Sequence, residues 1–163
     1  VIYIGRIIHL VANSIHLLIP EITKKEKEGS FDMFLSKAYP NSAAILLLSQ
    51  LHTFNDVSEK RRENCARYFD SLGGQKNWGS SDLIRYPYIT EDVATTVKKL
   101  KKKNIYPGRW YTQVVAPSDI SLKRMKYTKG SCPQAEKITH CIINFPTNIT
   151  PKQAQKIIKV LSP

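Results

Sequence analysis

Glycine and cysteine are both scarce in this chain of 163 residues. Its 7 glycines never form the G-x-G-x-x-G or Walker patterns, in which clustered glycines let the backbone approach a phosphate group. The G-x-S-x-G turn that carries the nucleophile of many serine hydrolases is also missing. Nucleotide binding in those two modes is therefore excluded, and the small number of glycines favours long regular elements.

The three cysteines, Cys65, Cys132 and Cys141, form an odd number with no C-x-x-C spacing. We expect no disulfide framework, and because a reducing compartment fits this composition we predict a cytoplasmic location. The four histidines are dispersed, so no metal site is predicted. Cys132 lies at an expected helix start, where a thiol can gain reactivity, but without an identifiable base we interpret it as structural.

Charged residues are rare in the first eighteen positions, which are largely apolar. Apolar side chains recur at three- and four-residue intervals from Val1 to Leu18 and predict a helix that Pro20 stops. Arg6 and several polar residues interrupt the run within one bilayer thickness, so we expect no membrane span. The chain lacks a signal-peptide pattern and does not begin with methionine, which suggests a start inside a longer reading frame. We expect residues 1–38 to be a connecting helix and loop, with residues 21–29 in the loop.

Acidic residues are outnumbered by basic ones, 13 to 25, which gives a formal net charge of +12. Such an excess attracts phosphate backbones and anionic lipid. The basic residues concentrate in the runs 24–25, 60–62 and 98–103. None is interleaved with aromatic residues that stack on bases, and such runs usually form solvated helix faces. We therefore expect no nucleic acid partner, and keep a basic binding module for nucleic acid or another polyanion as the alternative function.

Hydrophobic periodicity is clearest between Asn41 and Leu72. It predicts one helix of about thirty residues, which Gly73 and Gly74 end. We expect its apolar stripe to face a sheet, so that Leu48→Asp unfolds the domain by burying an unpaired charge.

The rest of the chain alternates short strands and helices. Strands are predicted at residues 83–89, 105–115 and 141–145. Helices are predicted after Thr90 and after two capping boxes, Ser131 with Gln134 and Thr150 with Gln153. This order predicts an α/β fold: a two-layer sandwich in which helices, one of them long, pack on a small sheet of three or four strands.

Acidic residues form no spaced pair suited to acid–base chemistry, so no catalytic residue is assigned. Glu136, in the short helix near Cys132, is the least ordinary of them. We interpret it as a surface or capping carboxylate.

Three stretches in collinear order carry a resemblance to a known family. They are Y-P-N-S-A-A at 39–44 with S-Q-L at 49–51 and E-K-R-R at 59–62, then N-I at 104–105 with R-W-Y at 109–111, and finally C-P-Q-A-E at 132–136 with I-N-F-P-T at 143–147. Together they resemble the C-terminal region of the DegT/DnrJ/StrS family of pyridoxal-phosphate-dependent aminotransferases, which aminate keto sugars on nucleotide carriers.

The resemblance implies that residues 39–163 form the small C-terminal domain of a fold-type-I aminotransferase. In that family the Schiff-base lysine, the carboxylate at the pyridinium nitrogen and the phosphate-binding residues lie in a large domain, which no segment here matches. We therefore expect this chain alone to bind no cofactor and to be inactive. Its implied partner is the large domain with pyridoxal phosphate, in a homodimer that acts on a keto sugar nucleotide or a related keto compound.

The resemblance also implies a substrate-binding segment. Trp110 and Tyr111 are expected to line one wall of the substrate pocket, with Arg109 pairing with a substrate anion. The other interpretation is that both rings fill the core of the sheet. Two departures from the family pattern are residues 35–38, where an Asn and an Arg are usual, and residues 112–114, where sugar-specific members carry a histidine. A third functional hypothesis is a stand-alone interaction domain descended from the enzyme.

Overall fold

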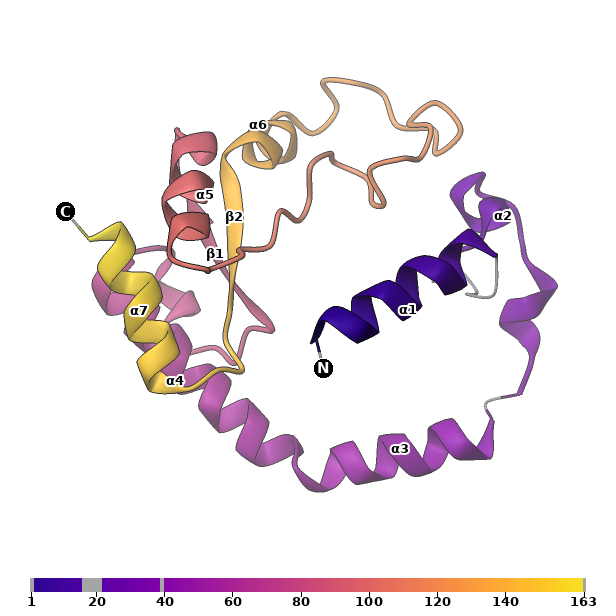
Figure 1. Ribbon diagram of the computed structural model, residues 1–163. Helices are drawn as coiled ribbons and strands as arrows, with labels where there is room; N and C mark the ends of the chain where they lie inside the picture. The colour runs from indigo at the N-terminus through magenta and orange to yellow at the C-terminus, as the bar shows by residue number, and fades with distance from the viewer. Residues whose placement is uncertain (1, 16–21, 39, 163) are drawn as a thin grey trace.

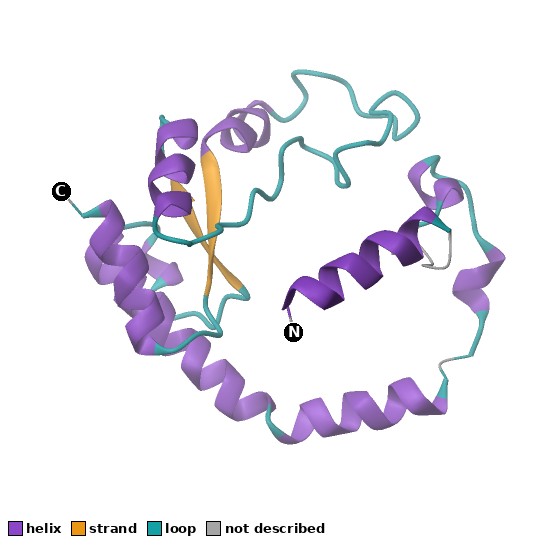
Figure 2. Cartoon of the chain, viewed as in Figure 1, coloured by secondary structure: helices purple, strands orange, loops and turns teal. Residues whose placement is uncertain are grey.

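The structure is a computed structural model that describes residues 2–15, 22–38 and 40–162 (Figure 1). Figure 2 shows a molecule built mainly of helices around one short sheet. In chain order the helices and strands are α1 (Ile2–Ser14), α2 (Lys24–Lys27), α3 (Asn41–His52), α4 (Phe54–Leu72), β1 (Arg85–Ile89), α5 (Val93–Lys102), α6 (Pro133–Cys141), β2 (Ile142–Pro146) and α7 (Pro151–Leu161). Single 3₁₀ turns occur at Met33–Ser36 and Lys76–Trp78.

The sheet consists of β1 and β2, which pair antiparallel with Tyr86 opposite Phe145. This arrangement of helices on a small sheet confirms the predicted α/β class, but the described sheet has two strands and not three or four. The strand predicted at 105–115 is reduced to one bridge, Gly108 to Asn144. The carbonyl of Trp110 accepts a hydrogen bond from the side chain of Asn144.

The core lies between the sheet and helices α4, α5 and α7. Tyr68 of α4, Tyr86 of β1 and Phe145 of β2 are fully buried. The Tyr68 ring centroid lies 5.3 Å from that of Tyr86 and 5.7 Å from that of Phe145, and such pairs add about 0.5–1.5 kcal/mol each beyond burial. The hydroxyls of Tyr68 and Tyr86 donate to the carbonyls of Pro146 and Gly73. Burial raises the pKa of both phenols, that of Tyr86 to about 12.

Helix α7 forms as the sequence predicts. Thr150 accepts a hydrogen bond from the backbone of Gln153, whose side chain accepts from the backbone of Thr150. This capping box satisfies two amides that the first turn leaves unpaired. The apolar spacing predicts that Ala154, Ile157, Ile158 and Leu161 face inward; the first three are buried and Leu161 is half-buried.

Other helix starts differ from the predictions. Asp92, not Thr90, caps α5 by accepting from the backbone of Thr95. The capping box predicted at Ser131 is wrong, since Cys132 occupies the cap of α6 without a side-chain bond. The loop predicted at 21–29 contains the short helix α2, which Thr23 caps. At α2 and α5 the cap is a residue type that commonly caps helices, whereas α6 begins without a side-chain cap.

The single long helix predicted at 41–72 is two helices that meet at Thr53. Helix α4 buries Asn64, Cys65 and Tyr68, whereas α3 buries no residue. Leu48, expected to face the sheet, is 58% exposed. The prediction that Leu48→Asp unfolds the domain assumed a buried Leu48, and this assumption is wrong.

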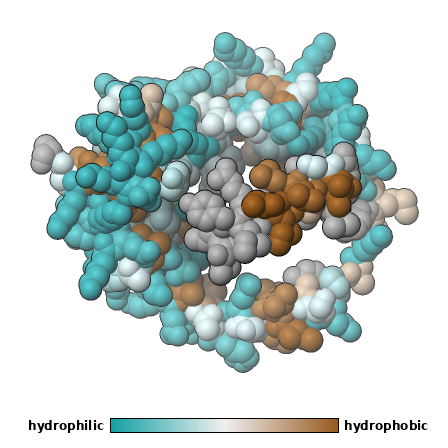
Figure 3. Space-filling model, in the orientation of Figure 1, coloured by the Kyte–Doolittle hydropathy of each residue, from teal (hydrophilic) through white to brown (hydrophobic). Residues whose placement is uncertain are grey.

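Helix α1 covers most of the predicted N-terminal helix, although Val1 and residues 16–18 lie outside the described residues. The large apolar side chains described from Ile7 onward are exposed, and Figure 3 shows one apolar cluster over α1 and a separate one over α3. The exposed side chains are Ile7, Ile8, Leu10, Val11 and Ile15. Within the described ranges no helix is long and apolar enough to cross a membrane.

Candidate functional site

The candidate site is built on the segment that leaves the edge of β2 at Gly108. Asn144 holds this segment at three points. Its backbone amide and carbonyl pair with Gly108 at 2.9 and 2.8 Å, and its side-chain amide donates to the carbonyl of Trp110. Asn144 is 8% exposed, so these bonds are shielded from water. The site segment is therefore fixed to the sheet just before the two predicted aromatic residues.

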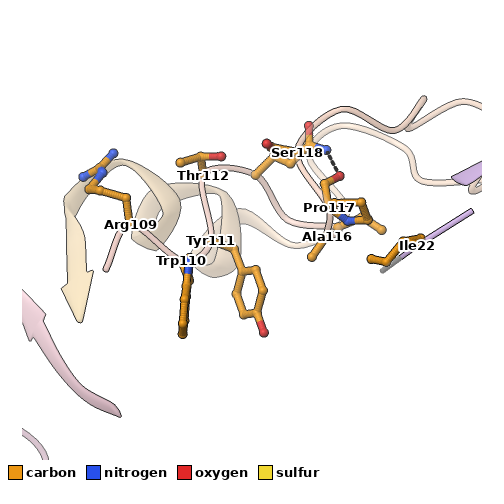
Figure 4. A pocket seen from close by; sticks show the side chains of 10 residues that line it. Ile22, Arg109, Trp110, Tyr111, Thr112, Ala116, Pro117 and Ser118 are labelled. Carbon is orange, nitrogen blue, oxygen red and sulfur yellow. Dashed lines mark hydrogen bonds between the residues drawn. The ribbon is translucent and has the colours of Figure 1, made fainter. Parts of the chain in front are cut away.

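Trp110 and Tyr111 project away from the core. Trp110 is 49% exposed and Tyr111 is 63% exposed, so neither ring fills the sheet's core. Figure 4 shows both rings pointing to the same side of the chain. Exposed aromatic rings beside polar groups are typical of surfaces that bind a ligand or another protein domain.

Two arginines lie near these rings, and the sequence pointed to only one of them. The guanidinium of Arg109 donates to the carbonyl of Ile142 at 3.3 Å, and its side chain extends away from the two rings (Figure 4). Arg85, at the start of β1, places its guanidinium carbon 4.9 Å from the centroid of the Trp110 ring. A cation at this distance is attracted by the ring face. Arg85 is thus the arginine that accompanies the aromatic pair.

A shallow pocket of about 530 Å³ opens beside the rings. Its remaining wall comes from Ile22, next to α2, and from the loop that follows Tyr111 (Figure 4). The lining residues are Ile22, Arg109, Trp110, Tyr111, Thr112, Gln113, Val115, Ala116, Pro117 and Ser118. This lining combines apolar side chains with one cation and several neutral polar groups, and contains no carboxylate.

Two ion pairs connect the helix α2 region to the loop behind the pocket. The Lys27 ammonium lies 2.5 Å from the Asp119 carboxylate, and the Arg124 guanidinium lies 2.9 Å from the carboxylate of Glu28. The bond from Lys27 holds the pKa of Asp119 below its ordinary value. Exposed pairs of this kind are individually weak, so they position the loop and contribute little to folding.

Glu136 of α6 fastens the other end of the same loop. One of its carboxylate oxygens accepts from the Tyr127 hydroxyl at 2.7 Å and from the Gly130 amide at 2.6 Å. These bonds, that from Tyr127 first, lower the pKa of Glu136, while the bond to Glu136 raises the pKa of Tyr127. The sequence interpretation of Glu136 as a surface or capping carboxylate is refined by this structure: it caps a loop.

The family comparison covers this site except for Ile22 and the α2 region. A model of the DegT/DnrJ/EryC1/StrS aminotransferase family matches residues 38–162. The chain belongs to this aminotransferase family. The resemblance expected from the sequence is thereby confirmed, and the family region includes α3, the sheet, the site segment and α7. Comparisons with curated proteins and with solved structures found no match.

The cofactor of this aminotransferase family, pyridoxal phosphate, makes three chemical demands. It needs a lysine amine for the Schiff base, a carboxylate at the pyridinium nitrogen and donors around the phosphate. The pocket beside Trp110 offers neither a lysine nor a carboxylate, so its residues do not fit the cofactor. Among the described residues no three metal-binding side chains cluster either.

Sequence reasoning missed Arg85, Asn144 and Ile22 as parts of this site. Asn144 did leave a signal, because it is a polar residue within the apolar run 142–145. Arg85 left no signal in the sequence, because its contact with the Trp110 ring depends on how the chain between the two residues folds. Ile22 reaches the pocket through the α2 ion pairs, which no local pattern encodes.

Proposed function

We propose that this chain provides the small-domain part of a pyridoxal-phosphate-dependent aminotransferase and that Trp110 and Tyr111 form one wall of its substrate pocket. In this proposal a large domain supplies the cofactor and all bond-making groups. The small domain orients the substrate and excludes water from it, which lowers the barrier without a catalytic side chain of its own. The observation that carries the proposal is the exposed aromatic pair, held by Asn144 beside Arg85, within the matched family region.

The proposed substrate is a keto sugar nucleotide or a related keto compound. Support comes from the charge of the site: Arg85 lies over the Trp110 ring, Arg109 belongs to the pocket lining, and that lining has no carboxylate to oppose an anion. An arginine fork suits phosphate oxygens, and an aromatic face suits the apolar side of a sugar or a base. We propose that the complete enzyme acts in the cytoplasm.

Assembly with a large domain, and of two such chains into a homodimer, is supported by helix α3. Its apolar residues are consecutive at 45–48, and all four are exposed. A helix that is apolar all round is normally buried in a larger structure. The α3 surface is therefore the expected contact with the large domain or with a second subunit.

The first test addresses chemistry in this chain alone. Mixed with pyridoxal phosphate, the chain should give no stoichiometric lysine adduct after borohydride reduction and no transamination. Scattered, substoichiometric adducts are expected because lysines are abundant. One fully modified lysine together with turnover would contradict the proposed division of labour.

The second test addresses the wall. In a holoenzyme that joins this chain to the cofactor-bearing domain, Trp110→Ala should lower kcat/KM by roughly 10- to 100-fold, because a substrate displaced by about 1 Å loses that much. The matched control is Tyr106→Ala, which also truncates an exposed ring but lies outside the pocket lining. Equal losses in the two variants, or none in Trp110→Ala, would refute the assignment.

A further inference from the structure

A second surface, on the side of the molecule away from α2, brings lysines from two helices together. Helices α5 and α7 pack against each other, and Figure 1 shows them next to one another. We call this surface the lysine face; it comprises Lys98, Lys101, Lys102, Lys103, Lys152, Lys156 and Lys159. All seven side chains are exposed, and Figure 3 shows hydrophilic residues covering this side.

The lysine face is hollowed and carries no opposing charge. A shallow depression of about 480 Å³ lies between Lys103 and α7 and also includes Lys152, Lys156 and Lys159 in its lining. A second one, of about 540 Å³, lies along α5 and includes the other three lysines. Neither lining contains an acidic residue, and neither helix contains Asp or Glu.

Three acidic residues, at the start of α5 and on α4, have partners of their own. Asp92 caps α5, and the bonds from Thr95, with a smaller contribution from Lys99, lower its pKa. On α4, Glu59 and Glu63 pair with neighbouring arginines of their own helix. Among the described residues no ion pair includes a lysine of the lysine face.

Helix stability does not account for this arrangement. Lys98 and Lys102, and likewise Lys152 and Lys156, are four residues apart on one helix, a spacing at which like charges destabilise. Lys152 lies in the first turn of α7, beside the positive end of the helix dipole, where a cation is disfavoured. The lysines in the last turn of α5 and Lys159 in the last turn of α7 do complement a dipole, but this does not account for Lys98, Lys152 and Lys156.

We propose that the lysine face binds the phosphate backbone of a duplex nucleic acid without reading its sequence. Lysine ammonium groups neutralise phosphates as point charges, and two rows of them on adjacent helices match a surface that is charged on both strands. Neither depression has an aromatic ring in its lining, so bases of a single strand have nothing to stack on. The inner faces of α5 and α7 are occupied by buried Leu100, Ile157 and Ile158, which leaves no apolar face to enter a bilayer.

The prediction of no nucleic acid partner was based on each basic run of the sequence taken separately. The lysines of α7 form no run in the sequence, and only folding places them beside residues 98–103. The proposal concerns a different surface from the aromatic pair and does not depend on the aminotransferase assignment. Either can fail without the other.

The test measures binding of the full chain to a labelled 24-base-pair DNA duplex of arbitrary sequence by fluorescence anisotropy between 50 and 200 mM salt. With about four phosphates neutralised, affinity should fall about 100-fold over this range. Affinity for a 24-nucleotide single strand should be several-fold weaker than for the duplex. Vesicles that contain phosphatidylserine serve as the membrane comparison.

Two triple variants separate the lysine face from net charge alone. Lys152→Glu/Lys156→Glu/Lys159→Glu should weaken duplex binding at least about tenfold. Lys24→Glu/Lys25→Glu/Lys123→Glu removes the same charge from exposed lysines on the other side of the molecule and should change affinity less than about threefold, because distant charges are screened. If the first variant does not fold, as judged by circular dichroism, the milder Lys152→Gln/Lys156→Gln/Lys159→Gln should lower the salt slope by about 3.

Several results would overturn the proposal. These are no binding of the wild-type chain at 50 mM salt, equal weakening by the two triple variants, single-strand binding as tight as duplex binding, and binding to the anionic vesicles in place of DNA. A loss confined to the lysine-face variants, with a steep salt dependence, is the result that the proposal predicts.

Discussion

Helices α3 and α4 follow one another with a single residue between them, yet α4 is partly buried and α3 is exposed. Helix α4 contains eight charged residues within Phe54–Leu72 and still buries four of its residues, while α3 contains none within Asn41–His52 and buries no residue. Hydrophobicity alone therefore does not place a helix in the core of this molecule. What decides is whether another element of the chain lies opposite it, and for α4 this element is α7.

The largest expected effect tests this contrast directly. Tyr68→Ala in α4 should lower the free energy of unfolding by about 3–5 kcal/mol, because it empties a fully buried site between two rings. Leu48→Ala in α3 should change it by less than about 0.5 kcal/mol. Urea denaturation of the two variants provides the measurement. Comparable losses would show that α3 is packed in the isolated chain and would remove the contrast.

A second, smaller effect concerns the polar contact between α4 and the turn before α7. The side-chain amide of Asn64 donates to the carbonyls of Thr147 and Ile149, both at 2.8 Å. Asn64→Ala leaves these acceptors unpaired in a buried place and should cost about 1–3 kcal/mol. Gln50→Ala, in exposed α3, is the matched amide removal and should be nearly neutral in the same urea titration. A neutral Asn64→Ala would mean that water replaces the lost donor.

The third expected effect is local and depends on pH. The pKa of Glu136 is lowered in the folded chain from its ordinary value of 4.5. At a pH above 4.5 the ionised carboxylate therefore contributes its full share to holding the loop. This contribution is lost as the pH falls through the lowered pKa. Hydrogen exchange at the Gly130 amide, corrected for intrinsic rates, should therefore lose protection between pH 7 and pH 3. In Glu136→Gln, whose carbonyl oxygen accepts both bonds without titrating, protection should stay constant. The same pH dependence in both proteins would assign the loop's anchoring to another group.

The smallest expected effect lies in the ion pairs that connect α2 to the loop. Lys27→Ala should accelerate tryptic cleavage near Arg124 by exposing the loop, and the matched Lys24→Ala, which removes a lysine of the same helix without an ion pair, should not. Raising the salt concentration should reduce the difference between the variant and the wild type, since exposed pairs are screened. Cleavage rates that are identical in all three proteins would show that the pairs do not restrain the loop.

The sequence was informative where structure is determined locally. The capping box of α7 and its buried face were predictable because Thr150, Gln153 and the apolar spacing all lie within one helix. The strands β1 and β2 were predictable from their β-branched and aromatic residues. The sequence left open whether Trp110 and Tyr111 line a pocket or fill the core of the sheet, and their exposure is a finding of the structure.

The features that the sequence did not reveal are all nonlocal. Periodicity in α3 signals an apolar helix, but it does not say whether the covering surface belongs to the same chain. The segment after Gly108 has strand-forming residues, but its Trp110 carbonyl accepts from the Asn144 side chain and it forms only one bridge to β2. The contact of Arg85 with Trp110 joins residues from β1 and from the site segment, and the α2 ion pairs join residues still farther apart in the chain.

The central claim, that Trp110 faces a substrate pocket completed by another domain, is tested most directly by acrylamide quenching of its fluorescence. The chain has two tryptophans, so a Trp78→Phe background isolates Trp110, and a Trp110→Phe chain isolates half-buried Trp78 as the control. Joining the cofactor-bearing domain should protect Trp110 from the quencher, substrate should protect it further, and Trp78 should be unaffected by either. Quenching of Trp110 that stays the same in the isolated chain and in the substrate-bound holoenzyme would contradict the account.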